Sequence, residues 1–302
     1  MRIRIVMCGL FAALLVHPAI AAAPGLQRLD SISLDGVERT WRIFVPDQYE
    51  EGKALPLVLN FHGTGSTPDR QSRLSGFEVL ASEAGFLVAA PAGKFTRTRG
   101  GRLTWNVDLR QDGVDDVLFV REMIYEISEQ FSVDPNRIYA TGFSGGGRMS
   151  SRLACDLADL IAAIGPVAGV RFPEDCSPSR PVPVITFHAR NDMVNHYEHQ
   201  SDSPGYWRMG VEDAISGWVK NNQCASTPTV KPVSKMVNLV EYRNCQGGGD
   251  VVFYRSEDGG HTWPVAPFAD VLEEPGSGLR DSETTATSLI WAFFKSHPFD
   301  GE

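Results

Sequence analysis

The 302-residue sequence has few cysteines, fewer basic than acidic residues and only one long apolar run. Its five cysteines include no Cys-x-x-Cys or Cys-x-x-His spacing, so a structural zinc site is not indicated. The 28 Lys and Arg residues against 37 Asp and Glu residues give a formal net charge of -9. A chain this acidic is not expected to bind nucleic acid or an anionic membrane surface. We interpret the one basic stretch, Lys94, Arg97, Arg99 and Arg102, first as a solvated loop and second as a rim near an acidic substrate.

The apolar run lies at the beginning of the chain. Arg2 and Arg4 give the chain a positively charged start, an apolar stretch continues to Leu15, and small residues follow from Ala19 to Ala23. This pattern predicts a secretory signal peptide over residues 1–21, cleaved between 21 and 23. Its loss removes two arginines and leaves a charge of -9 - 2 = -11. No other run reaches the ~20 apolar residues of a membrane span. We therefore expect an extracytoplasmic protein, secreted or periplasmic.

The remaining residues, 24–302, show no repeat, low-complexity tract or linker, so we expect one domain. Apolar runs typical of buried strands alternate with helical patterns, and Asp35-Gly36 predicts an early hairpin. The predicted strands are Ser31–Leu34, Thr40–Val45, Leu55–Phe61, Phe86–Ala90, Ile138–Phe143, Ala162–Val170, Val182–Phe187, Leu239–Tyr242 and Val251–Tyr254. The predicted helices are Arg70–Ala84, Asp115–Phe131, Arg148–Leu160, Tyr206–Lys220 and a last one around Leu289–Phe294. This order predicts an α/β fold whose mostly parallel sheet carries helices on both faces.

A Gly-x-Ser-x-Gly motif, Gly142 to Gly146, lies between a predicted strand and a predicted helix. That context is the one a nucleophile elbow requires. The two glycines allow the strand and the helix to approach closely at the turn. Ser144 is then expected to point outward at the positive end of the helix. The motif therefore predicts a serine nucleophile at Ser144.

Serine needs a base to remove its proton, and the base needs an acid to orient it. His261 lies in Gly259-Gly260-His261-Thr262-Trp263-Pro264, after the last predicted strand and before the last helix. Asp192 follows the strand Val182–Phe187 after a few loop residues, so it can reach across the strand ends. Asp202 and Asp213 are rivals, but one lies farther along the loop and the other within a predicted helix. The order Ser144, Asp192, His261 fits an α/β-hydrolase triad.

The oxyanion of such a reaction needs backbone N–H donors. Gly145, directly after the nucleophile, and Thr64, in the loop His62-Gly63-Thr64-Gly65, are the expected donors. We interpret His62 as structural. A metal alternative uses His188, Asp192, His196 and His199 as zinc ligands. Their spacing matches no zinc-protease motif, so we expect neither a metal nor a cofactor.

Four cysteines remain after the predicted cleavage, Cys155, Cys176, Cys224 and Cys245. An even number in an exported protein predicts two disulfides, for which three connectivities exist. Pairing of neighbours closes two loops of similar moderate length.

Leu57–Gly65, Val133–Gly146, the Asp192 loop and Gly260–Pro264 together resemble the secreted esterase family of polyhydroxybutyrate depolymerases and feruloyl esterases, carbohydrate esterase family one in the broad sense. The resemblance extends from about residue 30 to residue 298. It implies the α/β-hydrolase fold, the triad named above, and the two neighbouring cysteine pairs. Trp263 stands beside the base, and Trp105 and Asp116 fall in stretches similar to the family's. The chain departs from the family at His188-Ala189, where His-Gly is usual, and at Thr64-Gly65 in the oxyanion loop, which affects the shape of the acyl pocket.

We therefore expect a serine carboxylic-ester hydrolase that acts through an acyl-enzyme. Trp263 follows the base by two residues and Trp105 lies in the long loop after a central strand, so we predict that they form opposite walls of the acyl site. Two indoles at these positions favour a flat aromatic acyl group. The expected substrates are feruloyl or similar hydroxycinnamoyl esters of plant polysaccharide. The alternative is a hydrolase of polyhydroxybutyrate-type polyesters or their soluble oligomers. An acyltransferase and a catalytically silent binding protein on the same scaffold are the remaining readings.

Overall fold

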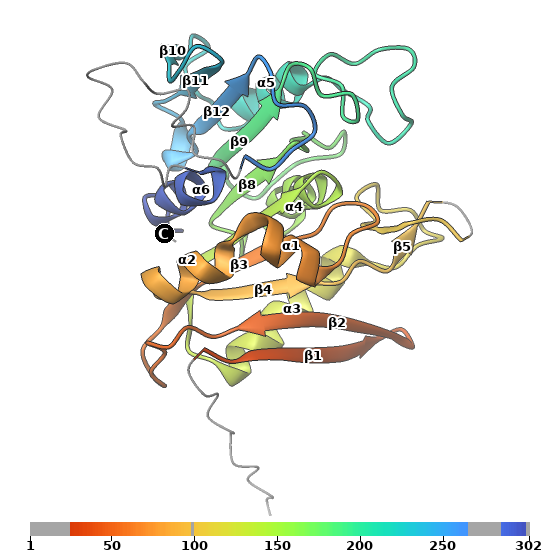
Figure 1. Cartoon of the computed structure of the whole chain (residues 1–302), viewed down its shortest axis with the longest axis vertical. Coiled ribbons are helices and arrows are strands. Elements are labelled where there is room, and N and C mark those ends of the chain that lie inside the picture. The colour runs from red at the N-terminus through yellow and green to blue at the C-terminus, as the bar shows by residue number, and fades with distance from the viewer. Residues whose placement is uncertain (1–24, 98–99, 265–284, 300–302) are drawn as a thin grey trace, which may run out of the picture.

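The computed structural model describes residues 25–97, 100–264 and 285–299. Its centre is a ten-stranded sheet with the order β1-β2-β4-β3-β7-β8-β9-β12-β11-β10 (Figure 1). These strands are β1 Gln27–Leu34, β2 Val37–Phe44, β3 Leu55–Phe61, β4 Leu87–Pro91, β7 Val133–Phe143, β8 Ala163–Val167, β9 Val184–Ala189, β10 Thr229–Pro232, β11 Val237–Tyr242 and β12 Val251–Ser256. A separate two-stranded ribbon joins β5 Phe95–Thr96 to β6 Leu103–Thr104. The predicted signal peptide lies outside the described residues.

The middle of the sheet is parallel and its two ends are antiparallel. Strands β4, β3, β7, β8, β9 and β12 pair in parallel, each with its neighbour. The hairpin β1–β2 continues the sheet at one end, and β11 with β10 continues it at the other, all by antiparallel pairing. Asp35 and Gly36 both have positive φ at the hairpin turn, as the Asp-Gly pair predicts. The carboxyl ends of the parallel strands therefore meet along one edge, where ligands of such sheets bind.

Helices cover both faces of the sheet, as the sequence predicts. They are α1 Pro68–Ser75, α2 Phe77–Ala84, α3 Asp116–Gln130, α4 Gly145–Asp156, α5 Val211–Asn221 and α6 Ala286–Lys295, with a short 3-10 turn at Gln246–Gly248. Figure 1 shows α1, α2 and α6 in front of the sheet and α3 behind it.

Two hydrophobic cores lie on the two faces of the sheet because side chains alternate along each strand. On β7, Ile138 and Ala140 belong to one core and Tyr139 to the other. The first core includes the apolar faces of α3, α4 and α5. The second includes those of α2 and α6. Both faces of the central strands are thus buried, which explains their nearly continuous apolar sequences.

Several details differ from the sequence-based predictions, among them the following. The single helix expected over Arg70–Ala84 is two helices, because Gly76 has a φ of 68° and ends α1 with a left-handed cap. The helix expected from Tyr206 begins only at Val211. The short edge strand β10 was not predicted, since all four of its residues are exposed and carry no alternating pattern.

The four described cysteines form the neighbouring pairs Cys155–Cys176 and Cys224–Cys245. Each bridge spans 21 residues, with Cα atoms 5.2 Å and 3.8 Å apart respectively. The first joins the last turn of α4 to the loop between β8 and β9. The second joins the segment after α5 to the segment before β12. The prediction of two local disulfides is confirmed.

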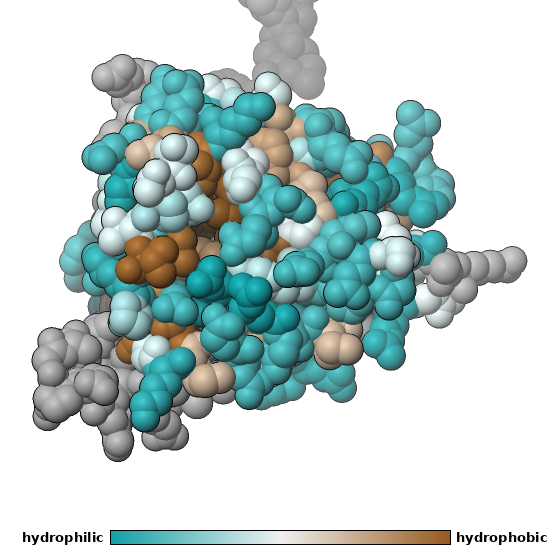
Figure 2. Space-filling model, turned by 90° about the horizontal axis from the view of Figure 1, so that it is seen from above, coloured by the Kyte–Doolittle hydropathy of each residue, from teal (hydrophilic) through white to brown (hydrophobic). Residues whose placement is uncertain are grey.

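The surface seen from above is mostly polar, with apolar residues gathered in a few places (Figure 2). Of the large apolar side chains that the structure describes, Met193 is the most exposed, at 81%. No helix among the described residues is long and apolar enough to cross a membrane.

Candidate active site

The Gly-x-Ser-x-Gly motif forms a sharp turn between β7 and α4. Ser144 lies at the turn with φ 54° and ψ -109°, a backbone conformation that residues other than glycine rarely adopt. Its N–H donates to the carbonyl of Val167 at 2.9 Å, and its own carbonyl accepts from the N–H of Arg148. The strain is held in place by these bonds and by the packed helix. It sets Ser144 at the N-terminus of α4, at the end of a central parallel strand.

The glycines of the motif are required by close backbone contacts. A β-carbon on Gly146 would lie 2.1 Å from the carbonyl oxygen of Phe61, and one on Gly142 would lie 2.6 Å from the same atom. Gly169, in the neighbouring loop, packs in the same way on the carbonyl of Ser144, where a β-carbon would be 2.3 Å away. The elbow is therefore built against β3 and the loop after β8 with no room for side chains.

His261 and Asp192 come together from two loops that are 69 residues apart. Nδ1 of His261 is 2.8 Å from Oδ2 of Asp192. The His261 ring also packs on the ring of Phe143, the residue before Ser144, with centroids 4.8 Å apart. The base and acid predicted from the sequence are thus paired, and the imidazole stands beside the elbow.

Asp192 is almost fully buried, at 3% exposed, and both of its oxygens have partners. Oδ1 accepts the N–H groups of Val194 and Asn195 at 2.8 and 2.9 Å. Burial alone would raise the pKa of Asp192, but hydrogen bonds from His188 and His261 outweigh it and hold this pKa well below its usual range. The carboxylate is therefore ionised wherever the protein is folded near neutral pH. Of the two rivals of Asp192, Asp213 caps α5, and Asp202 lies farther along the loop, where it lines a pocket beside Asp192.

His188 is a second histidine on the same carboxylate, a contact that the sequence did not predict. Its Nε2 is 2.8 Å from the carbonyl of Asn195 and 3.3 Å from Oδ2 of Asp192. The side chain is buried beneath the loop that carries the acid. His188 lies at the end of β9, four residues before Asp192, so this pair fixes the loop on the strand from which it emerges.

The expected oxyanion donors also lie side by side. A β-carbon on Gly145 would be 3.1 Å from the backbone nitrogen of Thr64 and 2.7 Å from its Oγ1. Within the described part of the chain, the Thr64 N–H donates no hydrogen bond. The Thr64 hydroxyl is 2.8 Å from that of Thr104, and Gly65 N–H donates to the carbonyl of Leu103 at 2.8 Å. The ribbon strand β6 thereby holds the Thr64 loop against the start of α4.

His62 has structural partners. Its Nε2 accepts the N–H of Gly93 at 2.9 Å, so its Nδ1 carries the proton and donates to the carbonyl of Gly63 at 2.8 Å. Burial lowers the pKa of His62, with an opposing contribution from the bond to Gly63. The ring is therefore neutral and links two loops.

The structure differs from the prediction that Trp105 and Trp263 face each other across an acyl site. Both indoles are buried, at 0% and 2% exposed, and they belong to different cores on opposite faces of the sheet. Trp105 donates to the carbonyl of His62 at 2.8 Å, and Trp263 donates to Thr287 Oγ1 at 3.1 Å. They support the oxyanion loop and the base loop from beneath. Asp116 is likewise internal, where it pairs with Arg39 and accepts the N–H of Asn106.

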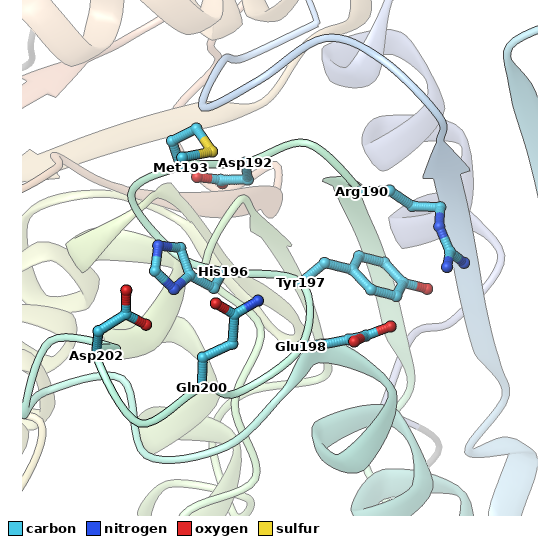
Figure 3. A pocket seen from close by; sticks show the side chains of 8 residues that line it. All are labelled: Arg190, Asp192, Met193, His196, Tyr197, Glu198, Gln200 and Asp202. Atoms are coloured by element: carbon cyan, nitrogen blue, oxygen red, sulfur yellow. The ribbon is translucent and has the colours of Figure 1, made fainter.

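A polar pocket of about 350 Å³ lies within the loop that carries Asp192 (Figure 3). Its lining residues are Arg190, Asp192, Met193, His196, Tyr197, Glu198, Gln200 and Asp202. Figure 3 shows His196, Gln200 and Asp202 on one side of the pocket and Tyr197 with Arg190 on the other. Asp192 and His196, two residues of the metal alternative, line this pocket but have other partners: Asp192 is engaged by His188 and His261, and His196 contacts Ser203. Among the residues that the structure describes, no group of three His, Cys, Asp or Glu side chains is arranged to hold a metal.

The family model described as "Esterase PHB depolymerase" matches residues 41–248, which is more than half of the chain and includes Ser144 and Asp192. The chain belongs to this family. The resemblance inferred from the motifs is thereby confirmed.

Two relatives illustrate the similarity within this esterase family. Feruloyl esterase B of Piromyces equi is 34% identical over 225 residues, which cover 72% of this chain and 41% of that protein. The putative esterase NocK of Nocardia uniformis subsp. tsuyamanensis is 30% identical over 262 residues, covering 79% of this chain and 74% of the relative. The chain thus spans less than half the length of the first relative.

Two solved structures of esterases are similar to this chain in fold. A thermostable esterase superposes with a TM-score of 0.58 at 18% identity, covering 90% of this chain and 63% of that one. An acetyl xylan esterase from Aspergillus awamori superposes with the same TM-score at 15% identity, covering 78% and 94%. At such identities the likeness concerns the fold alone. The fold is the α/β-hydrolase fold, as predicted.

Proposed function

We propose that this chain is a carboxylic-ester hydrolase that works through a covalent acyl-enzyme on Ser144, with His261 as the base and Asp192 as the acid that orients it. The observation that carries the proposal is the 2.8 Å contact between His261 Nδ1 and Asp192 Oδ2 beside the strained elbow. Because Nδ1–H donates to the carboxylate, Nε2 of His261 is left to accept the serine proton. The pairing thereby sets the tautomer that the reaction requires.

The reaction proceeds in two steps. The hydroxyl oxygen of Ser144 adds to the ester carbonyl while His261 takes its proton, and the N–H groups of Thr64 and Gly145 stabilise the tetrahedral oxyanion. Collapse breaks the bond to the alcohol, which leaves with the proton from His261. Water then adds to the acyl-enzyme by the same route and releases the acid. No metal or cofactor takes part in this scheme.

The proposed substrates are feruloyl or similar hydroxycinnamoyl esters of plant polysaccharide. Relatives named feruloyl esterases support this choice, whereas the tryptophan walls inferred from the sequence no longer do. The polar pocket beside Asp192 adds support, because carboxylate, amide and guanidinium groups suit a sugar alcohol better than an apolar one. The description of the family model favours the second candidate, oligomers of polyhydroxybutyrate-type polyesters.

An extracytoplasmic location belongs to the same proposal. The two disulfides favour an oxidising compartment, secreted or periplasmic. A polymeric plant ester as substrate requires release from the cell or a periplasm that receives its soluble fragments. The proposed partners are therefore ester substrates only, without nucleic acid or membrane.

A panel of esters tests the proposal. We expect kcat/KM to be higher for a feruloylated arabinose than for methyl ferulate, and higher for both than for a hydroxybutyrate dimer. Gln200→Ala should lower kcat/KM for the sugar ester and leave that for methyl ferulate unchanged, since only the sugar reaches the pocket. A native preference for the dimer would replace the first substrate class with the second. Activity of Ser144→Ala equal to that of the native protein would refute the acyl-enzyme, and transfer of the acyl group to added alcohol in preference to water would identify a transferase.

A further inference from the structure

Arg148 is a buried cation next to the proposed oxyanion hole. It follows the three glycines at the start of α4, and its N–H donates to the carbonyl of Ser144 at 3.0 Å. The residue is 1% exposed. Its Nη2 lies 3.5 Å from Thr64 Oγ1, and its guanidinium lies over the ring of Tyr206, 4.2 Å from the centroid.

No carboxylate neutralises this charge within the part of the chain that the structure describes. There, Nε and Nη1 of Arg148 have no hydrogen-bond partner, and the side chain forms no ion pair. The nearby carboxylate of Asp108 is already used by three other arginines. It bonds Arg171 at 2.7 Å and lies 3.8 Å from both Arg97 and Arg208. Arg97 is thus part of a partly buried ion-pair cluster around Asp108, not of the solvated loop expected from the sequence.

An uncompensated guanidinium inside a protein is costly. Burial, together with the neighbouring charges of Arg97 and Arg171, lowers the pKa of Arg148 to about 9, against opposing contributions from Tyr206 and Asp108. The group therefore remains charged at neutral pH, at an energetic cost that apolar packing would avoid. A fixed positive charge in a site of low dielectric becomes favourable when negative charge develops beside it.

The side chain of Thr64 connects Arg148 to the proposed oxyanion hole. Thr64 Oγ1 lies between Arg148 Nη2, at 3.5 Å, and the hydroxyl of Thr104, at 2.8 Å. The same oxygen would be 2.7 Å from a β-carbon on Gly145. A guanidinium has no acceptor, so Arg148 donates and Thr64 remains able to donate to Thr104. The orientation of the Thr64 loop therefore depends on both neighbours.

We propose that Arg148 is a positioning residue of the oxyanion hole, which holds Thr64 through its hydroxyl and places an un-neutralised positive charge beside the developing oxyanion. This inference rests on the proposed acyl-enzyme mechanism. It assigns Arg148 no proton transfer and no bond to the substrate. Its effect belongs to the transition state, since the ester carbonyl of the ground state carries little charge.

The test compares Arg148→Met with Arg208→Met. Both variants remove one positive charge from the same cluster, but only Arg148 contacts Thr64. The measurements are kcat and KM for p-nitrophenyl acetate, and Ki for a boronic acid, whose adduct with a serine is tetrahedral and anionic. We expect Arg148→Met to lower kcat by about 10- to 100-fold, somewhat less than the loss of a direct oxyanion donor. KM should stay within about twofold, and the boronate Ki should rise in parallel with the fall in kcat.

Arg148→Lys, which keeps the charge, should recover part of both losses, and Arg208→Met should leave kcat and Ki near native values. Should Arg148→Met fail to fold, Thr64→Val replaces it, because valine keeps the backbone N–H and removes the hydroxyl contact. Equal effects of Arg148→Met and Arg208→Met, or a Thr64→Val variant with native kcat and Ki, would overturn the inference. An inactive Ser144→Ala alongside either result shows that the acyl-enzyme mechanism itself stands.

Discussion

At the scale of single residues, the organising group is the Asp192 carboxylate. It accepts two backbone N–H groups on one oxygen and faces two histidines with the other. The backbone donors and His188 hold the carboxylate in place, which leaves a strong and oriented acceptor for His261. Both oxygens of the buried carboxylate thus have hydrogen-bond partners, and this network orients the imidazole of His261.

Asp192→Asn tests that role. We expect kcat for p-nitrophenyl acetate to fall by about 10³-fold or more, because an amide neither fixes the required tautomer of His261 nor stabilises the imidazolium. Asp213→Asn is the matched control, since Asp213 caps α5 and takes no part in the site. A loss below about tenfold in Asp192→Asn, with native folding by circular dichroism, would assign the acid to another residue.

The placement of the candidate site residues could be predicted from the sequence where it depends on local order. Ser144, Asp192 and His261 each follow a predicted strand, and their order along the chain is that of the fold. The tryptophans were misjudged because burial depends on the loops that fold over them, which no local pattern reveals. Arg148 was missed for a related reason: a polar residue after Gly145-Gly146-Gly147 looks like any first-turn residue until its surroundings are known.

At the scale of elements, the elbow depends on contact between the backbones of β3 and α4. The approach at Gly146 is so close that the carbonyls of Phe61 and His62 would lie 2.1 Å and 2.9 Å from an added β-carbon. Neither atom can move without displacing β3, which is hydrogen-bonded on both sides. The position of Ser144 is therefore coupled to that of the oxyanion loop, which begins where β3 ends.

Gly146→Ala should consequently damage both stability and activity. We expect a loss of about 3 kcal/mol or more in the free energy of unfolding, in the range of severe backbone clashes, and a fall in kcat in the fraction that folds. Gly205→Ala is the control, because a β-carbon there meets nothing within 4 Å. Chemical denaturation measures the free energy of unfolding of both variants, and kcat is measured on the same samples. A Gly146→Ala protein as stable and active as Gly205→Ala would contradict this account of the elbow.

The elements themselves were predicted best where they are buried on both faces. The strands of the parallel core lie close to their expected positions, because a short, continuous apolar run is typical of a strand that is buried on both faces. The break between α1 and α2 depends on a single left-handed glycine, Gly76, within a segment whose pattern otherwise suits one helix. The exposed strand β10 gains its structure only by pairing with β11.

At the scale of the whole molecule, two disulfides of equal span constrain different parts of the fold. Cys155–Cys176 ties the elbow helix to the loop after β8, and Cys224–Cys245 ties the segments that flank α5 and β12. In the chain-entropy view a bridge stabilises by restricting the unfolded chain, so equal loops should contribute equally.

We expect the double variants Cys155→Ala/Cys176→Ala and Cys224→Ala/Cys245→Ala each to lose about 3 kcal/mol of unfolding free energy. Urea denaturation of the two variants and the native protein, without reductant, measures this. Each pair is the control for the other. Stabilities unchanged in both would mean that the bridges do not form in the isolated protein, and peptide mapping without reduction would show four free thiols.

The central claim is that Ser144 carries the acyl group, and its most direct measurement is the mass of the trapped intermediate. Native protein mixed with p-nitrophenyl acetate and quenched in acid within the first turnover should carry one acetyl group, located on the peptide that contains Ser144. His261→Ala should form this adduct far more slowly, and Ser144→Ala should not form it at all. An acetyl group on a different residue, or full ester hydrolysis by Ser144→Ala, would contradict the account.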